Sequence, residues 1–444
     1  MITEVVVDVL VLGAGAAGLS ASVALAQAGM KPLIVEARDR IGGRIFTLYD
    51  PDLQAAIELG AEFIHGLPPE IWQILQNQNV APIEMEGDDW CFRRGKLSQC
   101  DFFSEVDKLL NRLSDEGVDE SFADFMAREG GRVSEETRQW ALGYITGFHA
   151  ADPTRISVHS LAKSAMADDK IDGHRSFRIP QGYGWLVEYF RQTLERLAIR
   201  TELNTVVERI EWARGQTRVF GLQRNQPIAF AAKRLLITVP LGVLQSGSIQ
   251  FSPELPTEKR NAMAHLAMGK VMRVNLRFRE RFWEPIQPEP ERPSRTLSDT
   301  AFLFSREPWF PTWWTTMPRR LPILTAWSPF PDAERLSGQG TESVVQKAID
   351  TLARLLSQPP GPLSSHLAEV HYHDWEADPF ARGAYSYVCV GGNHAEEDLG
   401  NPIDKTLFFA GEATDVSRHN GTVHGAIASG RRAAAEIKAS RAVD

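Results

Sequence analysis

The N-terminal part of the chain carries continuous apolar runs separated by a glycine-rich turn. Residues 5–12 are apolar except for Asp8, and residues 31–35 end in a second apolar run. Apolar runs without alternation are typical of parallel strands that are buried on both faces. We therefore predict a strand, a tight turn over residues 13–18, a helix to about residue 28 and a second strand, which together begin a parallel sheet.

The pattern changes along the rest of the chain. Residues 66–175 lack buried-strand runs and look helical, which predicts a second domain inserted into the first. Residues 234–244 are again continuously apolar, and residues 271–283 alternate like a strand with one exposed face. Residues 284–295 are rich in proline and predict a surface loop. We expect the α/β class, with one domain formed by residues 1–84, 176–269 and 394–444 and an α+β domain formed by residues 85–175 and 270–393.

Composition and charge exclude several classes of protein. The 444 residues are 43% hydrophobic and 24% charged, as in a globular protein with two or three domain-sized cores. A net charge of −9 argues against a nucleic-acid partner. There is no uninterrupted apolar stretch of about 18 residues, and the apolar start lacks a basic region and is broken by Asp8. We therefore expect no membrane span, no signal peptide and a cytoplasmic location.

Cysteines and histidines give no sign of a metal or a disulfide framework. Cys91, Cys100 and Cys389 are an odd number without a C-x-x-C pair, so we expect reduced thiols. His371 and His373 alternate on an expected strand without a third ligand nearby, and we expect no metal site.

The first turn predicts a dinucleotide site. Gly13, Gly15 and Gly18 fit the pattern G-x-G-x-x-G between strand and helix, where glycines allow a tight turn and let backbone N–H groups approach a pyrophosphate. Ala16 and Ala17 open the helix, whose N-terminus favours an anion.

The segment after the second strand favours FAD over NAD. Glu36 ends that strand, where a carboxylate accepts both ribose hydroxyls and repels the 2′-phosphate of NADP. Ala37 and Arg38 follow, and Gly43 and Arg44 belong to a second glycine turn. This turn and its arginines can fold back over the same pyrophosphate and neutralise it, which an NAD domain does not need. Alternatively, both arginines are solvated surface charges.

Eight segments, in order, resemble the flavin-dependent amine oxidase family, which includes monoamine oxidases, polyamine oxidases and lysine-specific histone demethylases. They are GAGAAGLSAS, EARDRIGGR, ELGAEFIHG, RIPQGYGWL, ITVPLGVL, MGKVMRVNLRFRERFW, DWEADPFARGAYSYV, and FFAGEATD with GTVHGAIASGRRAA. They extend over nearly the whole chain. The resemblance implies a Rossmann-type FAD-binding domain with an inserted α+β substrate-binding domain.

The resemblance also implies the residues of the cofactor site. Residues 59–66 would run over the flavin, the backbone of Val207 would bind adenine, and Trp375 would lie beside the isoalloxazine. Glu412 would accept a ribityl hydroxyl, and Thr422 would open a helix whose N-terminus faces the flavin. The expected FAD-binding residues are Gly13, Gly15, Ala16, Ala17, Gly18, Glu36, Ala37, Arg38, Gly43, Arg44, Gly60, Ala61, Glu62, Phe63, Val207, Trp375, Gly411, Glu412, Thr422, Val423 and Ala426.

Four positions distinguish this chain within the family. Ala384 stands where some monoamine oxidases carry a cysteine joined to the flavin, so we expect non-covalent FAD. Tyr385 matches one wall of the family's aromatic cage, while Thr422 replaces the tyrosine of the other, a pattern closest to the polyamine oxidase and demethylase branches. Arg273 stands where many members place a lysine bridged by water to flavin N5, and an arginine is not a tunable base. The expected catalytic residues are Arg273, Tyr385, Thr422 and His65, of which His65 would reach toward the substrate.

Two smaller points concern the neighbourhood of the substrate. Lys270 lies three residues before Arg273 and should face the opposite side of the strand. The aromatic residues within 309–314, together with Trp327, either line a substrate pocket or belong to the core, and the sequence leaves both open.

These features predict an FAD-dependent amine oxidase. A neutral amine would give a hydride equivalent to flavin N5, the imine would hydrolyse to an aldehyde or ketone, and O2 would reoxidise the flavin with release of hydrogen peroxide. An L-amino-acid oxidase, or another FAD oxidoreductase of this fold, is the first alternative. A flavin-binding protein without turnover is the second. The expected partners are a small-molecule amine and O2, not nucleic acid or a membrane, and the oligomeric state stays open, with a homodimer as one option.

Overall fold

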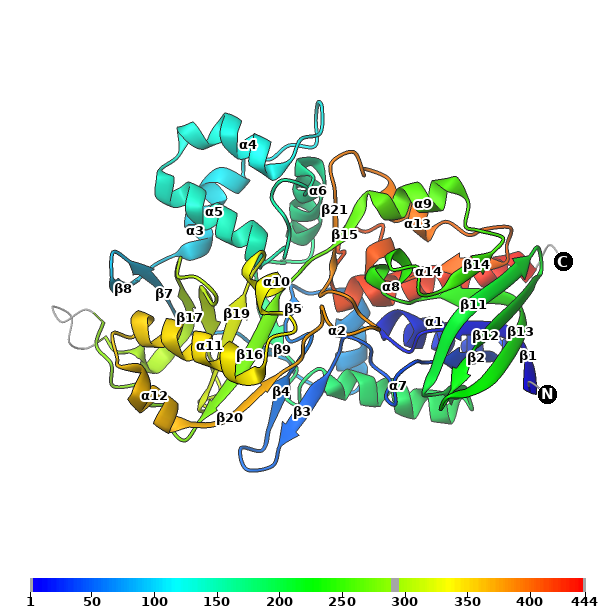
Figure 1. Ribbon diagram of the computed structural model, residues 1–444, viewed down its shortest axis with the longest axis horizontal. Helices are drawn as coiled ribbons and strands as arrows, with labels where there is room; N and C mark the ends of the chain where they lie inside the picture. Colours follow the sequence, from blue (N-terminus) through cyan, green and yellow to red (C-terminus); the bar gives the residue numbers. More distant parts are fainter. Residues whose placement is uncertain (1–2, 289–294, 442–444) are drawn as a thin grey trace.

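Strand β1 (Thr3–Leu12) lies at the centre of the first sheet, parallel to β2 (Pro32–Val35) on one side and β13 (Gln226–Ile237) on the other. Val9 in the middle of β1 is fully buried, as expected for a parallel strand covered on both faces. Helix α1 (Ala16–Gln27) connects β1 to β2. The predicted strand, turn, helix and strand are therefore confirmed in this computed structural model (Figure 1).

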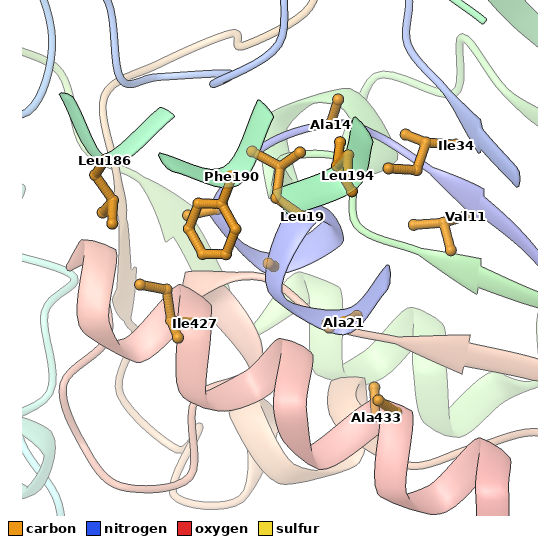
Figure 2. Packing of buried hydrophobic residues seen from close by; sticks show 14 of the residues in the cluster. Val11, Ala14, Leu19, Ala21, Ile34, Leu186, Phe190, Leu194, Ile427 and Ala433 are labelled. Atoms are coloured by element: carbon orange, nitrogen blue, oxygen red, sulfur yellow. The ribbon is translucent and has the colours of Figure 1, made fainter. Parts of the chain in front are cut away.

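The first sheet is completed by strands from distant segments. Its order is β10-β2-β1-β13-β12-β11-β14, with β22 beside β13. These further strands are β10 (Arg200–Glu202), β11 (Thr205–Ala213), β12 (Gln216–Gln223), β14 (Gln250–Ser252) and β22 (Leu407–Phe409). Helices α1, α7 (Gly184–Arg196) and α14 (Val423–Arg441) pack together over one face, where Leu19, Phe190 and Ile427 belong to one apolar cluster (Figure 2).

A second sheet forms the other half of the molecule, at the left of Figure 1. Its order is β20-β16-β19-β18-β17-β7-β8. The strands are β7 (Asp88–Arg93), β8 (Lys96–Gln99), β16 (Met272–Phe278), β17 (Thr300–Phe304), β18 (Thr312–Trp314), β19 (Ile323–Ser328) and β20 (Leu367–Tyr372). One apolar cluster joins this sheet to α10 (Asp332–Leu336), α11 (Thr341–Leu355) and α12 (Pro360–His366). Another joins it to α3 (Phe102–Leu110), α4 (Phe122–Glu129), α5 (Glu135–Gly147) and α6 (Val158–Asp169).

The remaining elements are shorter. They are β3 (Thr47–Asp50), β4 (Ala55–Glu58), β5 (Ile64–His65), β6 (Ile83–Glu84), β9 (Ser176–Arg178), β15 (Leu266–Met268), β21 (Ser386–Val388), α2 (Pro69–Asn77), α8 (Leu241–Gln245), α9 (Thr257–Ala264) and α13 (Ala395–Gly400). The first sheet is mixed, with β10, β2, β1, β13 and β22 parallel and β12 antiparallel to its neighbours, and this mixture of helices and parallel strands confirms the predicted α/β class. The domain boundaries stay a prediction, although the strands of each large sheet fall within the ranges expected for one domain.

The structure describes residues 3–288 and 295–441. Residues 289–294 of the predicted proline-rich loop therefore lie outside the described residues. Within these two ranges, no helix is long and apolar enough to cross a membrane.

Two predictions about residues 66–175 are wrong. The segment is not helical throughout, because β7 and β8 form a hairpin at the edge of the second sheet. The hairpin brings Cys91 and Cys100 together in a disulfide with a Cα–Cα distance of 5.7 Å, where we expected reduced thiols. A separation of nine residues between two cysteines does not by itself predict a disulfide, but the β7–β8 hairpin brings these two positions side by side. Cys389 is free and buried.

Candidate active site

A cavity of about 710 Å³ lies between the two large sheets, with walls from loops of the first and from strands β16 to β19 of the second. The predicted catalytic and FAD-binding residues line it, with Gly18 as the exception. A side chain at Gly18 would lie 2.0 Å from the carbonyl oxygen of Gly13, so this glycine lets helix and turn pack closely. Segments that are hundreds of residues apart thus meet around one space.

The two glycine turns lie against each other at one end of the cavity. Gly15 precedes α1 without a side-chain cap, and no atom lies within 4 Å of the place a β-carbon would take. Gly42 donates its N–H to the Ala14 oxygen at 2.8 Å, and Gly43 adopts a φ of +59° beside Gly15. Open space in front of an uncapped helix N-terminus fits the phosphates of a dinucleotide.

Glu36 is held at the same wall. Its Oε2 accepts the Ala14 N–H at 2.8 Å, and its Oε1 accepts the Arg38 N–H at 2.9 Å. Burial raises the pKa of Glu36, and these two N–H groups oppose the shift. Each carboxylate oxygen keeps a second lone pair, so the residue can still accept ribose hydroxyls.

Arg38 and Arg44 line the cavity as paired charges. Arg38 makes two hydrogen bonds to Asp378, at 2.8 and 2.9 Å, although the residues are 340 positions apart. Arg44 donates to Glu412 at 2.9 Å and to the Ala384 oxygen at 2.7 Å. They are neither solvated surface charges nor free cations over a pyrophosphate, because carboxylates already balance them. Direct phosphate contacts from their remaining N–H groups stay a prediction.

The segment around Gly60 is fixed from both sides. Trp375 donates its indole N–H to the Leu59 oxygen at 2.7 Å, and Arg273 donates to the Gly60 oxygen at 2.6 Å. A β-carbon on Gly60 would lie 1.9 Å from the Arg44 oxygen and 3.2 Å from the Trp375 ring. Only a glycine therefore lets this segment of the cavity wall pack so closely on Arg44 and Trp375.

Arg273 belongs to a buried cluster with Glu62 and Arg178. The Glu62 carboxylate lies 3.0 Å from Arg273 and 2.7 Å from Arg178, and the Trp314 N–H is 3.1 Å away. Burial raises the pKa of Glu62, but both arginines outweigh it, so the pKa falls below its ordinary value. Burial lowers the pKa of Arg273. Lys270 instead pairs with Glu376 at 2.8 Å and does not line the cavity.

The other three predicted catalytic residues, His65, Tyr385 and Thr422, also line the cavity. Burial lowers the pKa of His65 to about 4, so its ring is neutral at neutral pH. Tyr385 donates its hydroxyl to the Phe148 oxygen at 2.7 Å. Thr422 accepts the Gly425 N–H at 3.0 Å and caps the N-terminus of α14.

The other predicted cofactor residues also line the cavity. Glu412 accepts hydrogen bonds from Ser386 and Gly421 at Oε2 and from Arg44 at Oε1, which keeps a second lone pair, so the contact with a ribityl hydroxyl stays a prediction. Val207 pairs with Gly221 next to a register shift in the ladder between β11 and β12, and a contact of its backbone with adenine stays a prediction. The remaining lining residues of this set are Gly13, Ala16, Ala17, Ala37, Ala61, Phe63, Gly411, Val423 and Ala426.

Aromatic side chains line a large part of the cavity, and we call this part the aromatic arm. Its members are Phe63, Phe102, Phe103, Tyr144, Phe148, Phe302, Phe304, Trp314, Trp327, Tyr385 and Tyr387. The tryptophans expected either in a substrate pocket or in the core are divided between the two. Trp314 and Trp327 line the aromatic arm, while Trp313 is fully buried in the core. Sequence reasoning missed Tyr144 and Phe148, whose spacing of four on a helix was the available signal.

Neither a cysteine at the cavity wall nor a metal-binding cluster is found in residues 3–288 and 295–441. The residues that line the cavity include no cysteine, and Ala384 lines it where some monoamine oxidases carry the cysteine joined to the flavin. Over the same part of the chain, no cluster of three or more His, Cys, Asp or Glu side chains could hold a metal ion.

Comparisons with known proteins agree with this geometry. The family model described as flavin containing amine oxidoreductase matches residues 16–113 and 93–438. Polyamine oxidase 3 of Oryza sativa subsp. japonica is 28% identical over 97% of this chain and 88% of its own length. Lysine-specific histone demethylase 1 homolog 1 of the same plant is 30% identical over 97% of this chain, but only 52% of its own length is covered.

Solved structures share the fold. Putrescine oxidase bound to putrescine superposes with a TM-score of 0.81 at 20% identity, covering 98% of this chain and 100% of that one. Cyclohexylamine oxidase from Brevibacterium oxydans IH-35A superposes with a TM-score of 0.78 at 21% identity, covering 98% and 99%.

Proposed function

The chain belongs to the flavin containing amine oxidoreductase family and oxidises small amines with FAD, and we propose that its cavity holds FAD at the glycine turns and the amine in the aromatic arm. The observation that carries this proposal is the convergence on one cavity of residues expected from separate segments. FAD supplies the two-electron oxidation of the C–N bond when it is bound.

The chain's own residues would hold the cofactor by backbone and carboxylate contacts. The N-terminus of α1 offers free N–H groups to the pyrophosphate, and Glu36 offers lone pairs to a ribose. Gly60 and Trp375 would shape the space for the ring system. The N-terminus of α14, capped by Thr422, would stabilise negative charge that develops near it.

The substrate end would select a neutral amine. His65 is neutral at neutral pH, and the buried carboxylate Glu62 is committed to two arginines, so neither is available as a strong base. The amine would therefore lose its proton before or on entry, and the aromatic arm would exclude water around it. The oxidised product is an imine, which water hydrolyses to an aldehyde or ketone, and O2 takes up two electrons and two protons as hydrogen peroxide.

Several finer features complete the proposal. We propose that FAD is non-covalent, because Ala384 has no nucleophile to offer a flavin. We propose O2 as the acceptor, a homodimer as the assembly to test first, and the cytoplasm as the location. Disulfides are uncommon in the cytosol, so the redox state of Cys91 and Cys100 in cells tests the cytoplasmic location. A Cys91–Cys100 disulfide that persists in cells would argue against it.

One preparation tests the central claims. The purified holoprotein is mixed anaerobically with a panel of amines, and the flavin absorbance is followed; O2 is then admitted and peroxide is measured. We expect bleaching by at least one amine and stoichiometric peroxide. If every amine leaves the absorbance unchanged, the proposed arrangement is wrong. Acid precipitation should release FAD into the supernatant, and flavin retained in the pellet would contradict the non-covalent assignment.

A further inference from the structure

Positive charge is in excess at the inner part of the aromatic arm, where Arg273 and Glu62 line the cavity and Arg178, which is not a lining residue, pairs with Glu62. Two guanidinium groups, Arg178 and Arg273, face the single carboxylate of Glu62, and their side chains are 16%, 7% and 9% exposed. Glu58 is a further buried acid that interacts with Arg273, and burial raises its pKa to about 7. The cluster therefore has a formal charge of +1 where Glu58 keeps its proton. Charges interact more strongly where water is excluded, so the cluster disfavours a second positive charge on a bound ligand.

The aromatic faces beside this cluster are already used by its own cations. The Arg273 guanidinium lies 5.2 Å from the centroid of the Trp314 ring and 5.7 Å from that of Trp327. Arg178 lies 4.9 Å from the centroid of Phe63. Aromatic rings attract cations through their faces, but here Arg178 and Arg273 already lie over the ring faces nearest the cluster. The rings can therefore offer a ligand only apolar contact.

The carboxylates elsewhere on the cavity wall are committed or exposed. Glu36 binds two backbone N–H groups, and Glu412 binds Arg44 and Ser386. Glu208 is exposed next to Val207, on the first sheet. Asp168 remains, at the end of α6, with its side chain 44% exposed and His419 at 3.7 Å. Burial and Asp169 raise the pKa of Asp168 to about 6, against the effect of His419.

The outer part of the arm is apolar. Phe103 and Phe148, which line it, are 45% and 42% exposed, and Phe302 stacks with Phe304 at a centroid distance of 5.6 Å. Exposed aromatic rings on a cavity wall offer apolar surface that a hydrophobic ligand would cover.

Resting on the proposed function, we propose that the substrate is a monoamine with an aryl or alkyl body, and that a second ammonium group is excluded by the buried arginine pair. This separates the chain in substrate class from those relatives whose names specify polyamines. A carboxylated amine is the competing substrate class, and L-phenylalanine represents it in the substrate comparison.

The test compares substrates that differ by one charged group. Hexylamine is paired with 1,6-diaminohexane, and 2-phenylethylamine with L-phenylalanine; each is mixed anaerobically with the holoprotein, and the flavin reduction rate is measured against concentration. We expect the monoamine of each pair to have at least a tenfold higher second-order rate constant of reduction. An equal or faster diamine, or a faster amino acid, would overturn the inference while leaving amine oxidation intact. Flavin that none of the four reduces would overturn both.

A pair of variants that differ only in charge tests the electrostatic argument. Phe302 lines the aromatic arm, so Phe302→Glu places a carboxylate there and Phe302→Gln places an uncharged side chain of the same size. We expect Phe302→Glu to raise the ratio of diamine to monoamine reduction about tenfold over Phe302→Gln, with FAD content confirming that both fold. Equal ratios in the two variants would contradict the electrostatic basis. Phe148→Glu and Phe148→Gln, at a more exposed position, serve if Phe302 variants lose FAD.

Discussion

At the scale of single residues, Arg273 is more than a replacement for a lysine. Its guanidinium donates to the Gly60 oxygen at 2.6 Å and to the Glu58 oxygen at 3.3 Å, and it pairs with Glu62. A lysine offers one nitrogen, while an arginine offers donors in a fixed fork. The residue therefore organises the backbone that borders the cavity, whatever it contributes to chemistry.

We expect Arg273→Met to lower the free energy of unfolding by about 2–4 kcal/mol, because the Gly60 oxygen loses its donor and the Glu62 carboxylate loses one cation. The Glu58 oxygen keeps Asn275 as a donor. Arg273→Lys should lose less. Urea unfolding of the apoprotein measures the difference. Lys270→Met is the control, since its partly exposed pairs with Glu334 and Glu376 should be worth about 1 kcal/mol or less. Equal losses at the two positions would contradict the assigned role.

Glu58 has the clearest pH dependence among the buried acids beside the cavity. Burial raises its pKa from 4.5 to about 7, although Thr47 and the Tyr183 N–H donate to it at 2.6 Å. The folded protein therefore keeps the proton at pH values where the unfolded chain has released it. Stability from this group is present below about pH 4.5 and is lost as the pH rises to about 7.

We expect Glu58→Gln to remove that loss. Relative to the unsubstituted protein, the variant should gain about 1–3 kcal/mol of unfolding free energy between pH 5 and pH 8. Urea unfolding at four pH values measures the trend. Changes in the hydrogen bonds to Gln contribute equally at all pH values, so only the slope is diagnostic. The exposed Glu258→Gln is the control, and a parallel pH dependence in both variants would refute the assignment.

At the scale of elements, the ends of helices α1 and α14 border the cavity in different ways. The N-terminus of α1 begins at Gly15 without a side-chain cap, whereas Thr422 caps α14 by accepting the Gly425 N–H. The first helix leaves its N–H groups to a ligand, and the second satisfies one of them internally.

We expect Thr422→Ala to lower the free energy of unfolding by about 1 kcal/mol, and Thr422→Ser to retain most of it, because serine also caps a helix. Thermal and urea unfolding of the apoprotein check both. Should the serine variant lose as much as the alanine variant, the methyl group and not the cap would be what matters.

The β7–β8 hairpin predicts a defined thiol count. Since Cys91 and Cys100 are joined and Cys389 is buried, denatured but unreduced protein should expose one thiol per chain, and reduced protein three. Titration with a thiol reagent measures both. The variant Cys100→Ser should show two thiols without reduction. Three thiols in the unreduced protein would mean that the disulfide does not form in solution.

At the scale of the whole molecule, the cavity draws its walls from both large sheets. A ligand that fills it contacts both halves and is bound only by the folded chain. We expect saturating FAD to raise the unfolding free energy of the apoprotein by about 4 kcal/mol at about 1,000 times the dissociation constant. Thermal unfolding across an FAD series measures this.

The matched variant is Glu36→Gln. Its amide oxygen can accept only one of the N–H groups of Ala14 and Arg38, and its amide nitrogen cannot accept the other, so the dissociation constant for FAD should rise by about tenfold or more. The unfolding midpoint at a given FAD concentration falls accordingly. Glu258→Gln, on the surface of the same half, should behave like the unsubstituted protein. A Glu36→Gln protein with unchanged FAD affinity would remove Glu36 from the cofactor site.

The sequence by itself determined the β1–α1–β2 unit, the turn at Gly13, Gly15 and Gly18, and the family. These features are local: a continuous apolar run, a glycine turn and a helix follow one another within the first 35 residues and need few distant contacts to be recognised. The segments that carry the resemblance are also contiguous, so their order along the chain was visible without a structure.

Only the tertiary structure decided which charges are paired and which face of a strand meets the cavity. Arg44 meets Glu412 across 368 positions, and no spacing in the sequence encodes that distance. Trp313 and Trp314 are neighbours on β18, yet one enters the core and the other the aromatic arm. Successive side chains on a strand point to opposite faces, and the packing of the neighbouring strands and helices determines which face borders the substrate.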